Sequence, residues 1–491
     1  MNNNIEALLS GVLKKENMRS NLSDLRKCAK DPLNRECILD FFTGNIQLLI
    51  ECMKNDDAKT RKNAVLLAGD LELSQISEDI FEFYKNENTL FVKSAYLSAL
   101  YNMQIDNLIS DIEECYENLK KQEVAEENRK HVESELRELN KILIKYRGAS
   151  KHEISIDGVD VEVLLFCNRI HREIVKRAIT GHTAKVHPLG VLVKTDNLRE
   201  LLKLRLYRTI YFPVHTDKFV VADARKGARQ IWESDLMTIL NKIHKGGAPY
   251  YYRIDCQSTT DFPKKIAAAL DQISGGELIN SPGDYEIEIK LIPDRAGNYF
   301  CCMKTNAIRD DRFLYRKNSI SASIHPSTAA LIMEIAQTYL KENAQIMDPF
   351  CGVGTMLIER DNKVPAREIY GTDIFGDAIE MARENTSLAG KKVNYIHRDF
   401  FDFKHDYKFD EIISNMPIRG KKSKEEMDAF YGEFFDKAQE ILAEDAIIII
   451  YSNEAGFVKK QLRLRKNYKL ISETCMIKKT DFYLYIIKFM G

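Results

Sequence analysis

The sequence predicts a multidomain chain in which an all-α N-terminal region is followed by two α/β regions. Three observations indicate this class. Residues 1–148 carry helical spacing of apolar side chains, residues 155–305 alternate strand-like and helix-like segments, and residues 306–491 contain four short strands that each lead into a polar residue. At about 150 residues per domain, a chain of 491 residues also suggests three domains.

Composition limits the classes of function. A hydrophobic content of 44% and a charged content of 30% are typical of a globular chain with sizeable cores. The net charge of -1 excludes a general polybasic character, so any nucleic-acid binding must rest on local patches. No apolar run approaches the ~20 residues of a membrane span, and the first residues lack the features of a signal peptide, so we expect no membrane partner and a cytoplasmic location. Ten cysteines without a Cys-x-x-Cys pattern predict free thiols and no metal site.

The N-terminal region has an internal repetition. Ala64 and Ala68 recur as Ala95 and Ala99 with an offset of 31 residues, each pair following a polar turn. Small residues at helical spacing let paired helices approach, so residues 1–148 are predicted to form a HEAT-like helical domain, with a plain helical bundle as the alternative. A charged helical stretch over residues 123–145 is expected to serve as a linker.

The C-terminal region is organised around residues 346–355, which read Ile-Met-Asp-Pro-Phe-Cys-Gly-Val-Gly-Thr. This order predicts a strand, a tight loop and a helix. Glycines let a backbone come close to a ligand, and a helix that opens after such a loop presents free N–H groups to it. We therefore expect a nucleotide-type ligand here. The residues expected to contact it are Asp348, Pro349, Phe350, Gly352, Gly354 and Thr355.

Two ligand classes compete for this loop. A dinucleotide fold requires a small residue where this chain has Leu357, and Asp348 would repel a pyrophosphate. A ligand that carries an ammonium or sulfonium group suits an acidic loop better. The pattern therefore favours S-adenosylmethionine over NAD. A strand-to-helix turn with incidental glycines is the purely structural alternative.

Acids at the ends of the next two strands support a ligand site. Residues 368–373 predict a strand that ends in Asp373, 25 residues after Asp348, where doubly wound folds hold a ribose diol. Asp399, at the end of a third strand, is suited to accept from an adenine amino group. Ile374 and Phe400, the chain neighbours of these acids, complete the expected cofactor contacts.

The fourth strand, residues 409–414, leads into Asn415-Met416-Pro417-Ile418. The side-chain oxygen of Asn415 and a backbone carbonyl fixed by Pro417 can accept both hydrogens of one amino group. This directs the nitrogen lone pair at an electrophile, and transfer then needs mainly alignment and a charge-tolerant pocket. Asn415, which is also an expected cofactor contact, Pro417 and Ile418 are therefore the predicted catalytic residues.

This segment resembles the Asn/Asp-Pro-Pro-aromatic motif of amino-group methyltransferases. More narrowly, it is similar to the Asp/Asn-Met/Leu-Pro-Phe-Gly form in the THUMP-containing RNA guanine methyltransferases. Residues 311–317 and 324–328 precede the glycine loop as similar segments do in that family, and the resemblance covers roughly residues 155–491. The chain departs from the pattern at Ile418, where the family usually has Phe or Tyr to stack on the flipped base.

The resemblance implies an architecture and an activity. Residues 306–491 are expected to form a Rossmann-like methyltransferase domain with a seven-stranded, mostly parallel sheet. Residues 155–305 are expected to form a THUMP-like RNA-binding region, with Glu173 on its first helix, a basic amphipathic helix over residues 198–208, and a structural α/β insert as the alternative. The implied reaction is methyl transfer to the guanine 2-amino group. The basic residues expected to hold RNA phosphates beside a flipped base are Arg316, Lys317, Arg419, Lys421 and Lys422.

We therefore predict an RNA methyltransferase that forms N2-methylguanosine, with tRNA as the expected partner. Ribosomal RNA is the alternative substrate of the same chemistry. A DNA adenine 6-amino methyltransferase would share the Asn-x-Pro pattern, whereas an NAD oxidoreductase is disfavoured by Leu357. A non-catalytic RNA-binding scaffold is kept open by Ile418 and by the helical repeats.

Overall fold

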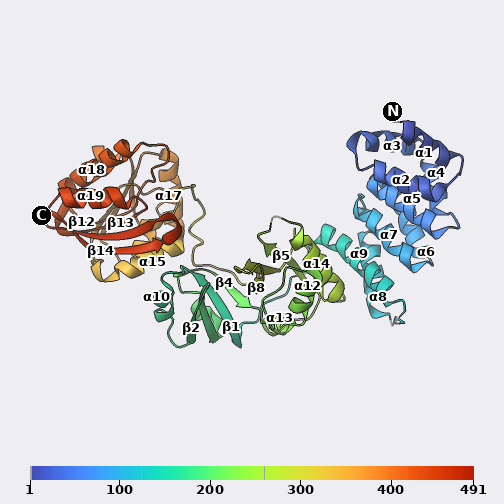
Figure 1. Ribbon diagram of the computed structural model, residues 1–491, viewed down its shortest axis with the longest axis horizontal. Helices are drawn as coiled ribbons and strands as arrows, with labels where there is room; N and C mark the ends of the chain where they lie inside the picture. Colours follow the sequence, from blue (N-terminus) through green and yellow to red (C-terminus); the bar gives the residue numbers. More distant parts are fainter. Residues whose placement is uncertain (1–2, 123, 126, 150, 259) are drawn as a thin grey trace.

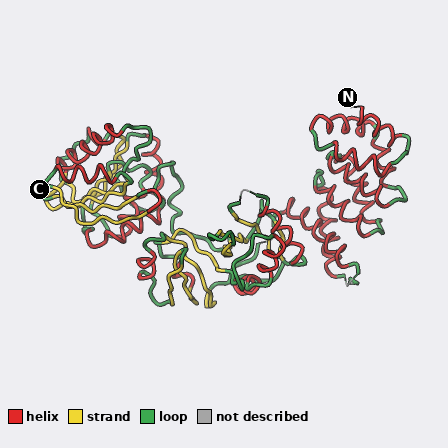
Figure 2. Tube along the Cα trace, in the orientation of Figure 1, coloured by secondary structure: helices red, strands yellow, loops and turns green. Residues whose placement is uncertain are grey.

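The computed structural model describes residues 3–122, 124–125, 127–149, 151–258 and 260–491. Over these residues the chain forms a helical N-terminal unit, a middle α/β unit and a C-terminal α/β unit, which lie in a row (Figure 1). Figure 2 shows that strands occur in the second and third units only. Glu123, the first residue of the predicted linker helix, lies outside the described residues.

In the helical unit, small residues allow two helices to approach closely. Ala64, Ala68, Ala95 and Ala99 are all buried, and a Cβ on Gly69 would lie 2.6 Å from the Cα of Ala99. Two helices therefore pack almost backbone to backbone at these positions. The HEAT-like assignment of residues 1–148 stays a prediction. The described helices are α1 (Asn3–Leu13), α2 (Met18–Cys28), α3 (Pro32–Gly44), α4 (Ile46–Met53), α5 (Ala58–Asp70), α6 (Ser77–Asn86), α7 (Leu90–Tyr101), α8 (Ile109–Lys121) and α9 (Arg129–Arg147).

The middle unit contains one eight-stranded sheet with the strand order β2-β3-β1-β4-β8-β7-β5-β6 in its described residues. Most neighbouring strands pair antiparallel, and β5 pairs parallel with both β6 and β7. Its strands are β1 (Asp157–Cys167), β2 (Thr183–His187), β3 (Gly190–Asn197), β4 (Tyr207–Pro213), β5 (Tyr250–Cys256), β6 (Leu278–Asn280), β7 (Ile287–Pro293) and β8 (Tyr299–Thr305). Its helices are α10 (Arg172–Arg177), α11 (Leu198–Leu201), α12 (Ala224–Trp232), α13 (Leu236–Ile243) and α14 (Phe262–Ile273).

The prediction of a basic helix over residues 198–208 is wrong. Helix α11 ends at Leu201, and Tyr207 already begins β4, which pairs with β1. Residues 207–212 are mostly aromatic and β-branched, which favours a strand once a neighbouring strand is available. Glu173 does lie in the first turn of a helix, α10, as expected.

The C-terminal unit contains a seven-stranded sheet in the order β11-β10-β9-β12-β13-β15-β14. The first five strands pair in parallel, whereas β15 is antiparallel to both β13 and β14. The sheet is therefore mixed, which corrects the expected mostly parallel sheet. The physical reason is the short turn between β14 and β15, because a tight hairpin can join only antiparallel strands. Its strands are β9 (Gln345–Asp348), β10 (Glu368–Asp373), β11 (Asn394–His397), β12 (Phe409–Asn415), β13 (Leu442–Ser452), β14 (Tyr468–Ile477) and β15 (Phe482–Phe489).

Helices cover the sheet so that its central strands are buried on both faces. The run of isoleucines in β13 illustrates this, since residues 446–452 are buried without alternation. Side chains on one face of β13 pack against α15 and α16, and those on the other face pack against α18. The helices are α15 (Pro326–Ala336), α16 (Thr355–Lys363), α17 (Gly376–Leu388), α18 (Lys424–Ile441) and α19 (Ala455–Leu464).

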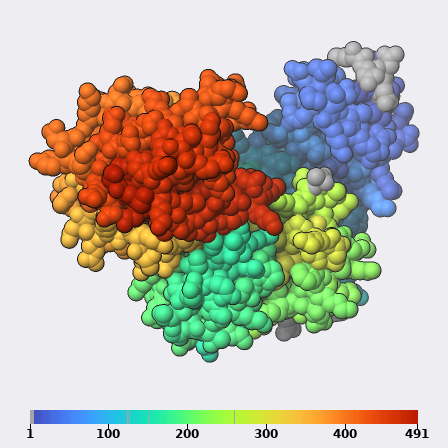
Figure 3. Space-filling model, turned by 60° about the vertical axis from the view of Figure 1, so that its left-hand side comes forward, coloured from blue at the N-terminus to red at the C-terminus, as the bar shows by residue number. Residues whose placement is uncertain are grey.

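A partly buried ion pair joins the middle and C-terminal units. Arg205 donates to both carboxylate oxygens of Glu359 on α16, at 2.9 and 2.6 Å, and Tyr315 Oη donates to the same carboxylate at 2.6 Å. Asn168 and His171 also donate to backbone carbonyls of β14 at 2.8 Å. Figure 3 shows the C-terminal part of the chain, in red, lying against the middle unit, in green. These contacts fix the middle unit against the helix that follows the glycine loop.

The segments that resembled the methyltransferase family mainly serve this junction. Arg312 is buried, binds Asp310 through two nitrogens, and stacks its guanidinium 3.6 Å from the ring centroid of Tyr207. His325 caps α15 by accepting from Ser327 N at 3.2 Å. Burial and the nearby Arg208 lower the pKa of His325 to about 4, so the ring is neutral near pH 7.

No helix in the described part of the chain is both long and apolar enough to cross a lipid bilayer.

Candidate active site

The glycine loop joins β9 to α16, so the predicted order of strand, loop and helix is confirmed. Gly352 and Gly354 have φ angles of 51° and 82°, left-handed values that strain any residue with a Cβ. A Cβ on Gly352 would meet nothing nearer than Ile320 Cδ1 at 4.0 Å. The loop therefore leaves open space above Gly352.

Gly354 packs closely against a neighbouring strand, and its expected contact with the ligand stays a prediction. A Cβ at this position would lie 2.1 Å from the hydroxyl oxygen of Tyr395 on β11. That hydroxyl is buried and hydrogen-bonded to Thr386 Oγ1 at 2.8 Å, so it has little freedom to move. Gly354 allows the loop to pack against β11.

Asp373 connects the end of β10 to the glycine loop. Its Oδ2 accepts from Gly352 N at 2.9 Å, and its Oδ1 accepts from Phe375 N at 3.0 Å. Ile374 and Phe375, which follow it, are exposed by 56% and 65%. An acid beside two exposed apolar side chains suits a ligand that combines a ribose diol with a flat base.

The start of α16 contains an unsatisfied polar atom. Oγ1 of Thr355 is buried without a hydrogen-bond partner in the described residues. The first N–H groups of α16 also lack partners within the helix and point toward the loop. A carboxylate would satisfy these donors. The residues present therefore fit S-adenosylmethionine, with the start of α16 for its carboxylate, Asp373 for its ribose, and Ile374 for its base.

Asp348 is buried and serves the protein framework. Its Oδ1 accepts from Phe350 N at 3.0 Å and from Ser414 Oγ at 2.7 Å. Burial raises the pKa of Asp348 to about 7, against the opposing effect of these hydrogen bonds. The carboxyl group thus ties β9 and its loop to β12. Its expected contact with the methionine end of the cofactor stays a prediction.

Two of the expected cofactor contacts lie in an aromatic cluster. The ring of Phe350 has its centroid 5.8 Å from that of Phe400 and 5.3 Å from that of Phe430. The side chain of Phe400 is 1% exposed and packs in the core around α18, so only its backbone can reach a ligand.

The other two expected contacts near this loop are Asp399 and Pro349. Asp399 is exposed, and its Oδ1 accepts from Phe401 N at 3.1 Å. Pro349 O accepts from Thr372 Oγ1 at 3.0 Å.

Asn415 is the last residue of β12, and its amide is oriented by a backbone group. Its Nδ2 donates to Ala322 O at 3.2 Å, which leaves Oδ1 as the atom that can accept from a ligand. Met416 N donates to Tyr451 O at 3.0 Å and holds the following turn to β13. Pro417 is half-buried in that turn. The asparagine therefore presents an acceptor at the carboxyl end of the sheet.

The segment 316–325 brings the two halves of the site together. Its Ala322 carbonyl holds Asn415, and its Ile320 lies over Gly352. Asn385 on α17 is fully buried and donates from Nδ2 to Asn318 O at 3.0 Å and to Val353 O at 3.2 Å. The cofactor loop and the predicted amine acceptor are thus linked to one segment. The sequence prediction missed the role of Asn385, although a polar residue on an apolar helix face was the available signal.

The predicted RNA-binding residues differ in their surroundings. Ile418 is 55% exposed at the tip of the loop after β12. Arg419 Nε donates to Lys422 O at 2.9 Å, and Lys422 Nζ lies 4.9 Å from the ring centroid of Phe430. Lys421 is exposed. Lys317 forms an ion pair with Glu384 at 2.5 Å, and Arg316 is half-buried with Nε unpartnered in the described residues. Of these cations, Lys317 has a carboxylate partner at the surface, and the guanidinium of Arg316 is partly buried.

The described residues contain no cluster of three or more His, Cys, Asp and Glu side chains that could hold a metal ion.

Comparison with known families identifies this region. Residues 314–481 match the model of the RMKL-like methyltransferase domain, a range that includes the glycine loop, Asp373 and Asn415. The C-terminal unit therefore matches an RMKL-like methyltransferase domain over most of its length. S-adenosylmethionine is the methyl donor of this class, in agreement with the prediction from the loop.

Curated proteins resemble the methyltransferase domain over part of their length. The chain is 28% identical over 155 residues to the tRNA (guanine(10)-N2)-dimethyltransferase of Methanothermobacter thermautotrophicus, a match that covers 30% of this chain and 45% of that protein. It is 28% identical over 159 residues to the bifunctional methyltransferase of Rickettsia felis, covering 32% of this chain and 27% of that protein. The chain thus spans less than half the length of these relatives.

Solved structures share the fold over a larger part of the chain. TrmN from Thermus thermophilus superposes with a TM-score of 0.50 at 15% identity, covering 67% of this chain and 99% of that one. A protein described as a predicted N6-adenine-specific DNA methylase from Listeria monocytogenes gives a TM-score of 0.50 at 15% identity, covering 67% and 96%. At this identity the similarity establishes a common fold alone. Because both matches are about twice as long as the family match, that fold extends beyond the methyltransferase domain.

Proposed function

We propose that this chain transfers a methyl group from S-adenosylmethionine to the 2-amino group of guanosine in tRNA. The observation that carries the proposal is the position of Asn415. Its amide nitrogen is held by Ala322 O at 3.2 Å, so that its oxygen is available at the end of β12, next to the glycine loop. An acceptor placed in this way can hold an exocyclic amine beside a cofactor site.

The chemistry follows from what each group can do. When bound, S-adenosylmethionine supplies a methyl group activated by its sulfonium. Oδ1 of Asn415 and a backbone carbonyl in the Met416–Pro417 turn are suited to accept the two amine hydrogens, which directs the nitrogen lone pair toward the methyl group. Asn415 and Pro417 therefore position the amine, and Ile418 offers an apolar contact to the base. Exclusion of water by the aromatic cluster around Phe350 would strengthen these interactions.

Three considerations support guanine in tRNA over other amines. The relative in Methanothermobacter thermautotrophicus acts on guanine in tRNA, as its description states. The Asn-Met-Pro segment resembles the form found in RNA guanine methyltransferases. We further assign residues 155–305 to a THUMP-like RNA-binding region, residues 306–491 to catalysis, and residues 1–148 to a HEAT-like domain. Ribosomal RNA remains the alternative substrate, and a cytoplasmic location accords with either one.

A DNA adenine methyltransferase is the second candidate. The acceptor pair at Asn415 would hold the 6-amino group of adenine as well as the 2-amino group of guanine. The geometry of the site alone therefore does not distinguish a guanine from an adenine methyltransferase, and the nucleic acid that the protein methylates does. A direct comparison of substrates is the appropriate test.

The experiment measures methyl transfer from labelled S-adenosylmethionine to total tRNA, ribosomal RNA and DNA. We expect transfer to tRNA, its loss when the target guanosine is replaced by inosine, and a reduction by ~100-fold in the rate of transfer by Asn415→Ala. Asn394→Ala, which removes a surface asparagine paired with Glu368, is the matched control. Transfer that persists on inosine-substituted RNA would contradict the guanine 2-amino assignment. Transfer to DNA alone would favour the second candidate, and the absence of transfer to any of the three would favour a non-catalytic scaffold.

A further inference from the structure

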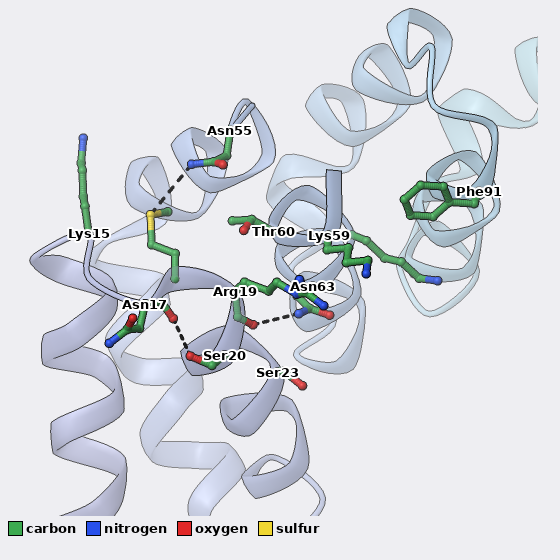
Figure 4. Close-up of a pocket in the computed structure, with 12 residues that line it drawn as sticks. Lys15, Asn17, Arg19, Ser20, Ser23, Asn55, Lys59, Thr60, Asn63 and Phe91 are labelled. Carbon is green, nitrogen blue, oxygen red and sulfur yellow. Dashed lines mark hydrogen bonds between the residues drawn. The ribbon is translucent and has the colours of Figure 1, made fainter. Parts of the chain in front are cut away.

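A groove of about 820 Å³ lies on the helical N-terminal unit, at the opposite end of the chain from the methyltransferase domain (Figure 1). Its lining comes from the turn before α2, from the first turns of α2 and α5, and from the start of α7. Figure 4 shows Arg19, Lys59 and Asn63 close together in this groove. The groove is therefore built from helix ends that follow one another in the helical stack.

The lining of the groove is positively charged. Four of its twelve lining residues are Lys or Arg, and none of the twelve is acidic, although the whole chain has a net charge of -1. Arg19 and Lys59 are exposed and have no ion-pair partner among the described residues. The third cation, Lys15, forms an ion pair with Glu51 at 2.9 Å, which offsets its charge. Two cations are thus free to meet an anionic ligand.

The acid that caps α5, beside the groove, is already committed to the protein. Asp57 lies close enough to Arg19 for this cation to contribute to lowering the pKa of its carboxyl group, after the larger effect of the Thr60 hydroxyl. Its carboxylate accepts from Thr60 Oγ1 at 2.7 Å and from Thr60 N at 3.0 Å, and so caps α5. The carboxylate therefore points at the start of the helix, where these hydrogen bonds hold it.

Helix ends add to the positive potential. The N-terminal end of a helix carries a partial positive charge and unpaired N–H groups, both of which attract anions. Helices α2, α5 and α7, of 11, 13 and 12 residues, all begin at this groove. The N-cap residues Asn17 of α2 and Thr89 of α7 form no side-chain capping bond. Cationic side chains, amides and the uncapped starts of α2 and α7 therefore act in the same direction, whereas the carboxylate of Asp57 neutralises the start of α5.

An aromatic ring completes the surface. Phe91 is half-buried at the start of α7, and Lys62 Nζ lies 5.8 Å from its ring centroid. A base can stack on such a ring while neighbouring cations contact its phosphates, a combination typical of single-stranded nucleic-acid binding. A smaller anion such as free phosphate would not need the ring or an open groove of this size.

We propose that this groove binds the phosphate backbone of the RNA substrate, at a distance from the site of methyl transfer. The proposal rests on the proposed function, because it takes the anionic polymer to be the RNA that the methyltransferase domain acts on. Arg19, Lys59 and Lys62 contact phosphates, Asn63 contacts a phosphate or ribose, and Phe91 contacts a base. The helical unit thereby adds to the substrate affinity that the basic residues of the catalytic domain supply.

The test compares two triple variants of the full chain. Arg19→Gln with Lys59→Gln and Lys62→Gln removes three of the four groove charges and leaves Lys15, which is paired with Glu51. Lys30→Gln with Lys121→Gln and Lys130→Gln removes the same number of exposed charges elsewhere in the helical unit. Binding of total tRNA is measured by fluorescence anisotropy over a range of salt concentrations, and thermal unfolding verifies that both variants are folded. We expect the groove variant to bind about 10-fold or more weakly than the control near 0.1 M salt, with a salt dependence reduced by about two ions.

Each outcome bears on the proposal. Equal tRNA affinities for the two variants would overturn it, as would a groove that binds poly-L-glutamate more tightly than tRNA, because the occupant would then be an acidic protein. Methyl transfer by the parent is scored separately. If the parent methylates tRNA and the groove variant binds as tightly as the control, the groove assignment fails alone. If the groove variant loses tRNA binding but the parent transfers no methyl group, the groove assignment stands and the proposed function fails.

Discussion

The backbone N–H of Gly352 donates to Oδ2 of Asp373 at 2.9 Å, so the acid that ends β10 also fixes the loop that follows β9. Its other oxygen accepts from Phe375 N at 3.0 Å. Each carboxylate oxygen retains a further lone pair after these bonds. One side chain can therefore hold the glycine loop in place and accept from a ribose diol.

Asp373→Ala is expected to weaken S-adenosylmethionine binding by about 10- to 100-fold, the scale of one charged hydrogen-bond interaction. Asp373→Asn should lose less, because the amide oxygen still accepts from Gly352 or from Phe375. Isothermal titration calorimetry measures both affinities. Asp377 is an exposed acid in the first turn of α17, so Asp377→Ala is the control, and it should bind S-adenosylmethionine as tightly as the parent. An unchanged affinity in Asp373→Ala would remove this residue from the cofactor site.

Gly354→Ala is expected to destabilise the fold and not only to block a ligand. A Cβ would require a left-handed backbone and would lie 2.1 Å from Tyr395 Oη, which together cost about 2–4 kcal/mol. Gly352→Ala has the backbone strain without the clash and should cost about 1–2 kcal/mol. Urea unfolding of both variants checks this order. Tyr395→Phe should recover part of the loss in Gly354→Ala, and a failure to do so would place the conflict elsewhere.

Local patterns predicted the order of elements in the catalytic region well. The apolar segments that became β9, β12 and β13, and the glycines before α16, carry their structural preference within a few residues. The helix expected over residues 198–208 failed because β4 depends on pairing with β1, a partner about 40 residues away in the sequence. Strands whose stability comes from distant neighbours are poorly visible in a local window.

In the candidate site, too, some features follow from local sequence patterns and others depend on residues far away in the chain. Gly352, Asp373 and Asn415 could be placed at or after the ends of strands because a glycine or polar residue follows an apolar segment in each case. The hydrogen bonds of Asn415 with Ala322 and of Asn385 with Val353 join segments 93 and 32 residues apart, and no local pattern encodes them. Whether an acid such as Asp348 faces a ligand or the core also depends on these distant neighbours.

The carboxyl group of Asp348 should make folding stability depend on pH. Its pKa is raised from the ordinary value of 3.8 to about 7, so between these values the folded protein retains a proton that the unfolded chain has lost. The contribution of this group to stability therefore falls as the pH rises from about 4 to about 7, and it stays low above pH 7. Asp348→Asn keeps an acceptor for Ser414 Oγ and Phe350 N without the charge.

We therefore expect Asp348→Asn to gain stability relative to the parent as the pH rises through this window, by up to about 4 kcal/mol. Thermal unfolding at a series of pH values measures the difference between variant and parent, with Asp377→Asn as the exposed control. A difference that is flat between pH 4 and pH 7 would show that the carboxyl group titrates normally in the folded protein.

A buried ion pair links α16 to β12 and should be sensitive to the loss of one partner. Arg360 and Glu411 are both 0% exposed and are joined by two hydrogen bonds of 2.8 Å, and Glu411 also accepts from Lys341 N at 2.7 Å. Glu411→Ala leaves a buried guanidinium without its partner and should cost about 3–5 kcal/mol. Replacing both residues, as Arg360→Met with Glu411→Leu, should cost less than Glu411→Ala. Chemical denaturation distinguishes the two, and equal losses would show that the ion pair itself supplies net stability.

Ile418 is the position where a substitution is expected to improve the enzyme. It is 55% exposed at the tip of the loop after β12, so a larger ring has room there and should leave the unfolding temperature unchanged. An aromatic ring that stacks on a flipped base contributes about 1–3 kcal/mol, whereas isoleucine offers apolar contact alone. Ile418→Phe should therefore tighten RNA binding or raise the rate of transfer, while Ile418→Leu should change neither. Single-turnover transfer to the same tRNA, at saturating S-adenosylmethionine, compares the three proteins. If Ile418→Phe is inactive while the parent and Ile418→Leu transfer well, the base cannot lie against this loop tip, and the pocket must be arranged around Phe350 and Asn415 without it.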